Sequence, residues 1–252
     1  MIALAGSVAL VSGGSRGIGR ACALALARAG ADVALSYQRD GAAAAETAQA
    51  VRQLGVRAIA VEASLTSFRA AADLVQRVTE TLGAPTILVA NHGIWRAAAI
   101  DTMTEADLDQ TLDTNVTGVF GLCRAVVPSM KQARRGRIVL IASTAGQRGE
   151  ARHSPYAASK GAIISLTKSL APELAPDGIL VNCVAPGWVA TDMTQAALAD
   201  TARAPGILAA IPLGRVAQPE EIAGAVVFLA SDLATFVCGE ILNVNGGAVL
   251  CG

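Results

Sequence analysis

Aromatic side chains are scarce in this sequence of 252 residues, at 3%, although hydrophobic residues as a group make up 53% of it. A core for this chain must therefore be built from Ala, Val, Leu and Ile rather than from rings. Charged residues make up only 16%. Such a composition excludes a disordered chain, and the length suits one α/β domain over residues 1–252.

An excess of either charge is also missing, because 20 Lys and Arg residues balance 20 Asp and Glu residues. A nucleic-acid partner requires a basic excess, so none is expected. No apolar run approaches the ~20 residues that cross a bilayer, and no membrane association is expected. The apolar start of the chain has no basic segment before it and runs into a glycine-rich turn. It predicts a buried first strand rather than a signal sequence, and hence a cytoplasmic protein.

Paired metal or disulfide ligands are absent as well. The five cysteines are scattered, and there are only two histidines, His92 and His153. A zinc site or a disulfide framework needs closer, paired spacing. We expect no metal, and cysteines that act as small buried hydrophobic residues: Cys22, Cys123, Cys183, Cys238 and Cys251.

What the chain does have is a regular alternation of short apolar runs and longer amphipathic stretches. The apolar runs are continuous in Val, Ile, Leu and Ala, as is typical of strands buried on both faces of a parallel sheet. The pattern predicts a doubly wound, Rossmann-type parallel sheet of about seven strands with helices on both faces. The strands are expected at 8–11, 33–36, 58–61, 87–90, 138–142, 179–184 and 241–244, and the helices at 17–28, 42–54, 68–82, 105–131, 156–174 and 219–230. The segment 188–213 breaks this rhythm and predicts a mobile lid over a site.

The first predicted turn is rich in glycine and reads Ser-Gly-Gly-Ser-Arg-Gly-Ile-Gly over residues 12–19. It follows a strand and opens a helix, the context in which a dinucleotide pyrophosphate binds to free backbone N–H groups. A plain tight turn is the alternative, but the strand–turn–helix context favours cofactor binding.

The end of the second strand bears on which dinucleotide is bound. An acidic residue there would hold a ribose 2′-hydroxyl and favour NAD, but the strand ends in Tyr37, Gln38 and Arg39. Arg39, together with Arg16 of the glycine turn, suits a 2′-phosphate through charge and a fork of donors. The sequence therefore favours NADP(H) over NAD(H), unless both arginines are merely solvated.

Tyr156 and Lys160 are four residues apart, which places them on one face of a helix. A free tyrosine titrates near pH ~10, too high for an acid/base at neutral pH, and a nearby ammonium lowers that pKa. The pattern alone is weak, since an exposed helical pair would look the same. The spacing predicts a tyrosine with a lowered pKa.

Two further residues strengthen that interpretation. Ser143 ends a buried strand and is expected at the same sheet edge as the glycine turn, where its hydroxyl would hold a substrate oxygen; a simple helix cap is the alternative. Asn115 lies in the middle of a predicted helix, where Asn is unfavourable. It either holds a water near Lys160 or is simply tolerated.

Taken together and in order, these motifs resemble the short-chain dehydrogenase/reductase family from end to end. The motifs are the glycine turn, Asn91-His92-Gly93, Asn115, Ser143, Tyr156-x-x-x-Lys160 and Pro186-Gly187. The tail looks most like the 3-oxoacyl-[acyl-carrier-protein] reductase branch, through 211–215, 219–222, 228–232 and 243–247.

The resemblance implies a mechanism in which nicotinamide delivers a hydride to a carbonyl carbon. Tyr156 would protonate the oxygen, Ser143 would orient it, Lys160 would hold the nicotinamide ribose, and Asn115 would complete a proton relay through water. It implies a homotetramer and a cofactor site formed by Gly13, Ser15, Arg16, Gly17, Ile18, Gly19, Tyr37, Arg39, Asn91, Gly93, Tyr156, Lys160, Pro186, Gly187, Val189 and Thr191.

The chain departs from the family pattern at three positions. His92 stands where Ala is usual, and it either reshapes cofactor packing or affects only the sheet edge. Ser64 stands where an Asp often contacts adenine. Pro172 is expected to interrupt the helix after Lys160, at a point where carrier-protein reductases tend to have a basic residue. The last difference weakens the acyl-carrier assignment and leaves the reductase assignment intact.

The sequence thus predicts an oxidoreductase acting on a small-molecule carbonyl or secondary alcohol, with a 3-oxoacyl thioester or a related ketone as the substrate. The alternatives are an NAD-linked secondary-alcohol or sugar dehydrogenase and, more remotely, a cofactor-binding regulator without turnover. The candidate substrate residues lie on loops and do not choose among these: Ile94, Trp95, Gln147, Arg148, His153, Trp188 and Met193.

Overall fold

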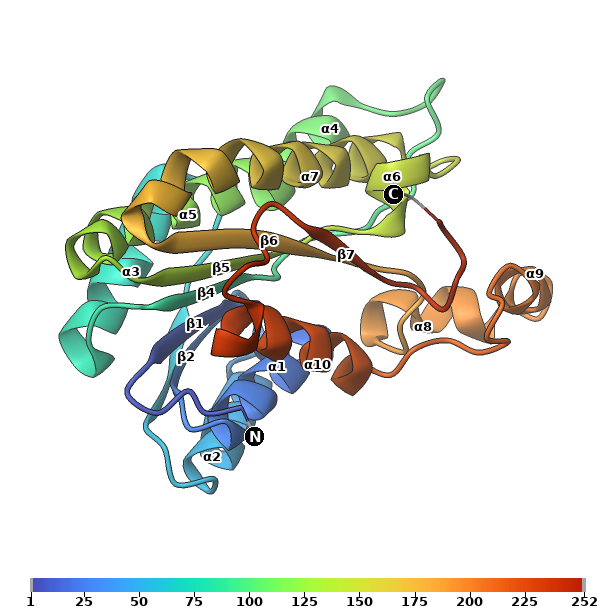
Figure 1. The fold of residues 1–252 in the computed structure, drawn as a ribbon. Helices are drawn as coiled ribbons and strands as arrows, with labels where there is room; N and C mark the ends of the chain where they lie inside the picture. Colours follow the sequence, from blue (N-terminus) through green and yellow to red (C-terminus); the bar gives the residue numbers. More distant parts are fainter. Residues whose placement is uncertain (1, 251–252) are drawn as a thin grey trace.

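The computed structural model describes residues 2–250 and contains a seven-stranded parallel sheet with helices on both faces (Figure 1). The strand order is β3-β2-β1-β4-β5-β6-β7. The strands are β1 Val8–Ser12, β2 Asp32–Tyr37, β3 Ala58–Glu62, β4 Ile87–Ala90, β5 Gly136–Ile141, β6 Ile179–Pro186 and β7 Ile241–Val244. The predicted doubly wound fold is confirmed.

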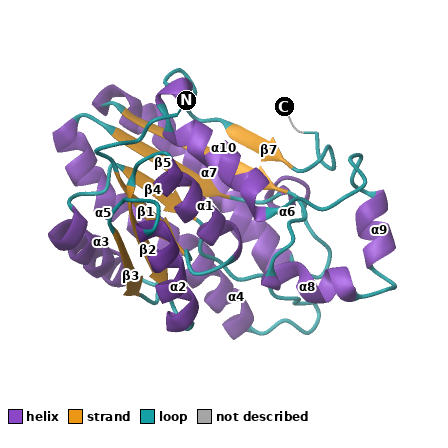
Figure 2. Ribbon diagram, turned by 90° about the horizontal axis from the view of Figure 1, so that it is seen from below, coloured by secondary structure: helices purple, strands orange, loops and turns teal. Residues whose placement is uncertain are grey.

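Two apolar cores flank the sheet, because the strands β1 to β6 present buried aliphatic side chains on both faces. On one face pack α1 Gly17–Arg28, α2 Gly41–Arg52 and α10 Pro219–Ala230. On the other pack α3 Phe68–Leu82, α5 Gly118–Ala133 and α7 Ser154–Leu174. The two layers lie on opposite sides of the strands in Figure 1, and Figure 2 looks from below onto the face of the sheet that α1 and α10 cover. Leu and Val fill both cores, as the scarcity of aromatic residues requires.

The functional edge of the sheet is the one at which the parallel strands end. The chain leaves β1 toward β2 on one side, while β4 pairs with the other side of β1. This reversal of strand order opens a crevice at the carboxyl ends of β1 and β4, where ligands bind in open α/β sheets. Residues from the ends of β1, β2, β4, β5 and β6 therefore meet there.

One predicted helix, 105–131, is divided into three segments. It consists of α4 Glu105–Leu112, a π-helical turn η1 Asp113–Thr117, and α5. The apolar periodicity continues across the turn, so the pattern alone does not reveal the wider i→i+5 bond from the Gly118 N–H to the Asp113 carbonyl. The interruption expected at Pro172 is wrong: α7 continues through it to Leu174, because a proline in the last turn removes only one donor.

The segment predicted as a lid contains two short helices, α8 Asp192–Ala199 and α9 Ala204–Ala209, beyond the carboxyl end of β6. Its apolar side chains form a third, small cluster around Ala197, Ile207 and Ile211. Within residues 2–250, no helix is long and apolar enough to cross a membrane. Cys22, Cys123 and Cys183 are buried as expected, Cys238 is exposed contrary to expectation, and Cys251 lies outside the described residues.

Candidate active site

A cleft of about 870 Å³ lies along the edge at which the strands end. It gathers most of the predicted cofactor and catalytic residues. From the prediction, its lining includes Gly13, Arg16, Gly17, Ile18, Tyr37, Arg39, Asn91, Gly93, Ser143, Tyr156, Lys160, Pro186, Gly187, Val189 and Thr191.

The glycine turn forms one wall of the cleft with its backbone alone. Gly13 and Gly17 have φ values of 65° and 52°, in the left-handed region that favours glycine. A Cβ on Gly19 would collide with the Gly13 carbonyl and would lie 2.6 Å from Asn91 Nδ2, so Gly19 permits close packing rather than lining the cleft. Ser15 is also not in the lining; its carbonyl accepts a hydrogen bond from Thr47.

The N-terminus of α1 is suited to a phosphate. Its N-cap residue, Arg16, provides no side-chain cap, and the first turn holds no acidic residue. The first N–H groups of the helix thus have no side-chain acceptor, and they begin at a residue that lines the cleft. A dinucleotide pyrophosphate fits this arrangement of backbone donors.

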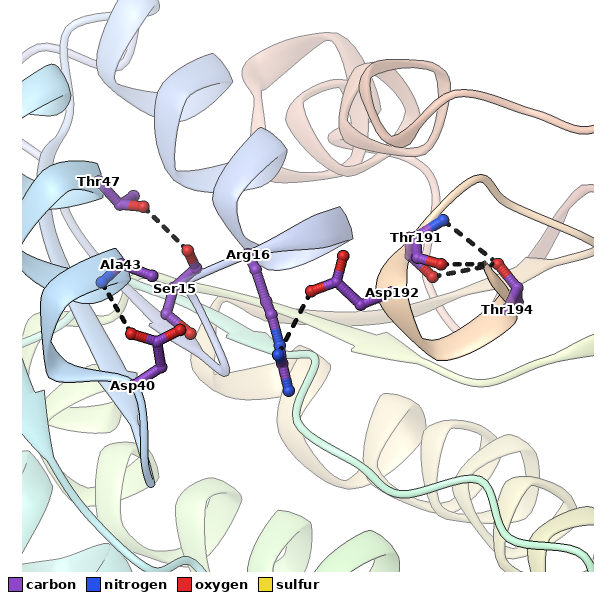
Figure 3. A network of polar contacts seen from close by, with 8 residues as sticks. All are labelled: Ser15, Arg16, Asp40, Ala43, Thr47, Thr191, Asp192 and Thr194. Carbon is purple, nitrogen blue, oxygen red and sulfur yellow. Dashed lines mark hydrogen bonds and ion pairs between the residues drawn. The ribbon is translucent and has the colours of Figure 1, made fainter. Parts of the chain in front are cut away.

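Arg16 and Arg39 both line the cleft, but Arg16 already has a partner. Its Nη1 lies 3.3 Å from Asp192 Oδ2 at the start of α8, and both side chains are largely exposed. Figure 3 shows Arg16 extending from the glycine turn toward the lid, with Thr191 and Thr194 beside Asp192. The ion pair links the cofactor turn to the lid, and sequence reasoning did not anticipate it.

The predicted catalytic residues Ser143, Tyr156 and Lys160 come together at the same edge. Ser143 follows β5 and accepts the Ala145 N–H at 3.1 Å as the N-cap of α6 Thr144–Arg148, so it is a cap and a cleft residue at once. The Lys160 ammonium donates to the Ile141 carbonyl at 2.7 Å and lies 5.8 Å from the centre of the Tyr156 ring. The ammonium is therefore fixed beside the phenol.

The expectation of a lowered tyrosine pKa is wrong for this structure. Burial raises the pKa of Tyr156 to about 12; a hydrogen bond with Ser143 lowers it in part, and the Glu150 carboxylate raises it further. Burial also lowers the pKa of Lys160 to about 8. Desolvation outweighs the attraction between ammonium and phenolate that the spacing suggested. At neutral pH the phenol is protonated, which is the form a proton donor needs.

Asn115 is fully buried in the π-helical turn and is fixed by three hydrogen bonds. Its Oδ1 accepts the Ile94 N–H at 2.8 Å, and its Nδ2 donates to the Ile94 carbonyl and to Ser159 Oγ, both at 3.0 Å. A Cβ built on Gly93 would lie 3.2 Å from Asn115 Oδ1 and 3.6 Å from Lys160 Nζ. Asn115 thus lies behind the cleft wall and holds the chain after β4 against α7.

His92 fastens the glycine turn to the sheet. Ser12 Oγ accepts the N–H groups of Asn91 and His92 and forms a hydrogen bond of 2.7 Å with His92 Nδ1. Burial, followed by the charge of Lys160, lowers the pKa of His92 to about 4. The ring is neutral at pH 7 and brings no positive charge to the cleft.

The predicted substrate residues divide into two groups. Ile94, Trp95 and Met193 line the cleft, while Trp188 and His153 pack against Trp95. The structure does not place Gln147 and Arg148 in the lining: Gln147 Nε2 donates to Asn243 at 2.7 Å, and Arg148 is exposed. Both lie in α6, and its direction depends on its packing against α7, which the sequence pattern does not reveal.

Several lining residues were missed by sequence reasoning. They are polar residues after β3, at the mouth near Trp95, and at the start of the lid: Thr66, Arg96, Gln110, Asp192 and Thr194. The general rule that ligands bind beyond strand ends would have identified Thr66. Glu150, which contacts Trp95, had no motif to mark it.

Comparisons with known proteins agree with this geometry. Residues 13–249 match a family model described as enoyl-(acyl carrier protein) reductase. The chain is 43% identical over 244 residues to the 3-oxoacyl-[acyl-carrier-protein] reductase FabG of Escherichia coli K12, covering 96% of this chain and 97% of that protein. The chain belongs to the short-chain dehydrogenase/reductase family. A 3-oxoacyl-[acyl-carrier-protein] reductase of Synechocystis is 41% identical, covering 99% of this chain and all of the relative.

Solved structures of the family superimpose closely. A protein described as a 2-deoxy-D-gluconate 3-dehydrogenase from Agrobacterium tumefaciens, with bound NADP, has a TM-score of 0.90 at 40% identity and covers 98% of this chain and 97% of its own. One described as an NAD(P)-dependent gluconate 5-dehydrogenase from Beutenbergia cavernae reaches 0.92 at 40% identity, covering 98% of both chains. The chain is accordingly an oxidoreductase that transfers a hydride between a nicotinamide dinucleotide and a carbonyl or alcohol carbon.

Proposed function

We propose that the protein uses NADPH to reduce the carbonyl of a 3-oxoacyl thioester or a related ketone, with Tyr156 as the proton donor. The observation that carries this proposal is the placement of Tyr156. Its side chain is half-buried, is hydrogen bonded to Ser143, and lines the same cleft as the glycine turn, and its raised pKa keeps the phenol protonated at neutral pH. Reduction consumes a proton at the carbonyl oxygen, and a neutral phenol supplies it.

Each catalytic side chain has a separate task. When bound, the nicotinamide supplies the hydride that reduces the carbonyl carbon. Ser143 directs the substrate oxygen toward the Tyr156 hydroxyl, and its own hydroxyl stabilises charge that develops on that oxygen. Lys160, held by the Ile141 carbonyl, places a cation beside the phenol and favours the phenolate left after proton transfer.

Asn115 acts chiefly through position. Three hydrogen bonds occupy both amide hydrogens and one lone pair of Oδ1. A relay water reaching this side chain would use the second lone pair of Oδ1. The two hydrogen bonds between Asn115 and the backbone of Ile94 hold Gly93 beside Lys160. The amide therefore fixes the distance between the proposed cofactor wall and the helix α7.

The preference for NADP(H) rests on charge at one end of the cleft. Arg39 follows the end of β2, Arg16 comes from the glycine turn, and both line the cleft. A 2′-phosphate would gain charge-assisted hydrogen bonds from them, each worth about 1.5–3 kcal/mol. The pyrophosphate would bind at Gly13–Gly17, and the nicotinamide half would lie along Gly187, Val189 and Thr191. The NADP bound to the Agrobacterium relative supports this preference.

The competing function is that of a sugar dehydrogenase, which the names of the structural relatives favour. Dissociation constants for NADPH and NADH test only the cofactor preference, because these relatives also have NADP bound. A clear preference for NADH contradicts our interpretation of Arg16 and Arg39. The homotetramer and the cytoplasmic location stay predictions.

Replacing Tyr156 by Phe tests the mechanism. The variant keeps the ring and removes the hydroxyl, so kcat for ketone reduction should fall by about 10³-fold or more while the Kd for NADPH changes little. NADPH absorbance over a panel of oxoacyl thioesters and ketones measures the rate, and fluorescence titration measures the Kd. A variant that kept the parent rate would rule out Tyr156 as the proton donor.

A further inference from the structure

Ser159 lies in α7 between the two proposed catalytic residues of that helix, Tyr156 and Lys160. Its side chain is fully buried and is not part of the cleft lining. The hydroxyl Oγ donates to the Tyr156 carbonyl at 2.7 Å and accepts Asn115 Nδ2 at 3.0 Å. A hydroxyl outside the cleft therefore joins the main chain of the proposed proton donor to the π-helical turn.

The two hydrogen bonds of Ser159 have fixed directions, because a hydroxyl has a single proton. The Tyr156 carbonyl takes that proton, which leaves only lone pairs for Asn115, so the amide nitrogen must face Ser159. The Ile94 backbone requires the same orientation, since its carbonyl accepts Nδ2 and its N–H donates to Oδ1. Ser159 and Ile94 together thus fix which way the Asn115 amide is turned.

This orientation places the amide oxygen on the side of the Lys160 ammonium. A Cβ built on Gly93 would lie 3.2 Å from Asn115 Oδ1 and 3.6 Å from Lys160 Nζ, so both atoms border the same small volume. The Ile141 carbonyl takes only one of the three ammonium protons. An amide turned over would bring its NH₂ group to this side, opposite the Ile94 N–H, and would offer the ammonium no acceptor.

A hydroxyl that bonds back into its own helix is common, and by itself it has only a local effect. Ser129 of α5 donates to the Val126 carbonyl at 2.9 Å, three residues back, just as Ser159 does. Thr79 of α3 donates in the same way at 2.8 Å, four residues back. Within residues 2–250, neither of these two hydroxyls accepts a hydrogen bond from another element. What sets Ser159 apart is the second bond, from a buried amide in a π-helical turn, a feature that is frequent at functional sites.

We infer that Ser159 is a positioning residue for the reaction and that it acts through Asn115 on the space beside Lys160. The inference rests on the proposed reduction and adds to it a residue that touches neither substrate nor cofactor. Without the hydroxyl, one N–H of the Asn115 amide would be buried with no acceptor, so the amide would turn or shift to find one. Oδ1 would then leave its place beside the ammonium, whereas the glycine turn would keep its own contacts.

Two replacements of Ser159 test this role. Ser159→Ala should lower kcat for ketone reduction at least about tenfold and leave KM and the Kd for NADPH within about threefold. Ser159→Cys fills nearly the same space, but sulfur is a weak acceptor, so this variant should lose kcat as the alanine variant does. Ser129→Ala removes the matched hydroxyl and should keep kcat within about twofold. Parent kcat in the cysteine variant, or an equal loss in Ser129→Ala, overturns the inference.

A double-mutant cycle tests whether the effect passes through Asn115. In the Asn115→Ala background the amide is already missing, so adding Ser159→Ala should lower kcat by less than about twofold further. Adding Ser129→Ala to the same background serves as the control and should also change kcat by less than about twofold. A tenfold further loss on adding Ser159→Ala would mean that Ser159 acts independently of Asn115, which contradicts the inference.

Thermal unfolding of the same variants needs no turnover and separates this inference from the proposed reduction. Ser159→Ala should lower Tm by about 2–8 °C in the parent and by much less in Asn115→Ala. If the parent reduces no ketone, the proposed reduction fails, and kcat for oxidation of a secondary alcohol by NADP⁺ then supplies the rates for the cycle. A lower Tm in Ser159→Ala with kcat unchanged would show a purely structural hydroxyl, and the inference would fail while the reduction stands.

Discussion

The two ends of the cleft are built in different ways. The glycine-turn end is made of backbone: left-handed glycines, an uncapped helix N-terminus, and strand ends. The substrate end is made of long side chains on loops, with Trp95 and Trp188 held by partners far away in sequence. The glycine-turn end suits one class of ligand, and its geometry follows from residues close together in the sequence. The substrate end depends on tertiary contacts, so replacing its side chains can change the substrate without changing the fold.

Removing the Lys160 ammonium, which lies between the two ends of the cleft, should have the largest effect on turnover. Lys160→Met is expected to lower kcat by about 10²–10³-fold, since the phenolate formed after proton transfer loses its charge partner. In the parent enzyme, burial places the pKa of Lys160 near 8, so the ammonium is present below that pH and is lost above it. The rate of reduction should therefore decline as pH rises through about 8.

Lys160→Arg provides the check on this pH effect. A guanidinium keeps its charge across the range, so any residual activity should lack the decline near pH 8. The pH profiles of kcat for the parent and the arginine variant measure the difference. A decline that persists unchanged in the arginine variant would assign it to another group.

Adding one methyl group to the glycine turn tests the cofactor end of the cleft. Gly19→Ala should weaken NADPH binding by about 100-fold, because its Cβ would collide with the Gly13 carbonyl and displace the turn. Gly224→Ala, on α10, is the matched control, since no atom lies within 4 Å of its Cβ. The control should bind NADPH normally and be stabilised by about 0.5–1 kcal/mol. Equal affinity in the two variants would show that the turn does not set cofactor binding.

The link between the glycine turn and the lid should have the smallest effect. Asp192→Asn removes the partner of Arg16 in an exposed ion pair, which is worth about 0–1 kcal/mol. Arg16 is then free for a cofactor phosphate, so the Kd for NADPH should fall by up to about fivefold while that for NADH stays the same. Isothermal titration with both cofactors decides this. Tighter binding of NADH alone would place Arg16 away from the 2′-phosphate.

The sequence predicted the backbone end well, and the reason is physical. A strand buried on both faces reads as a continuous aliphatic run, so β4 was placed with the correct bounds; the half-buried edge strand β7 was placed correctly as well. The turn needs glycine at three positions, because two have left-handed backbone and one has no room for a Cβ: Gly13, Gly17 and Gly19. The spacing of these glycines therefore predicts the turn from the sequence alone. The proposed catalytic residues Ser143, Tyr156 and Lys160 were expected together from strand ends and helical spacing, and the structure brings them into one cleft.

The errors concern properties that arise only after packing. The pKa of Tyr156 depends on burial, which a four-residue spacing does not report. The π-helical turn around Asn115 keeps the apolar periodicity of its neighbours and so escapes a pattern search. Gln147 and Arg148 do not line the cleft, since α6 is oriented by its packing on α7, and Glu150 contacts Trp95 from a loop that no motif marks.

The small cluster of Ala197, Ile207 and Ile211 is separate from the two cores that flank the sheet. Opening of α8 and α9 would then break the Arg16–Asp192 pair and remove the apolar cluster from Trp95 and Trp188, and would leave the aliphatic layers intact. Amide hydrogens of these two helices should exchange with solvent through local opening, at a free energy well below that of global unfolding, whereas those of β5 should exchange only when the whole domain unfolds. We therefore expect the sheet and its two helical layers to unfold as one cooperative unit, and α8 and α9 to form a second unit of lower stability.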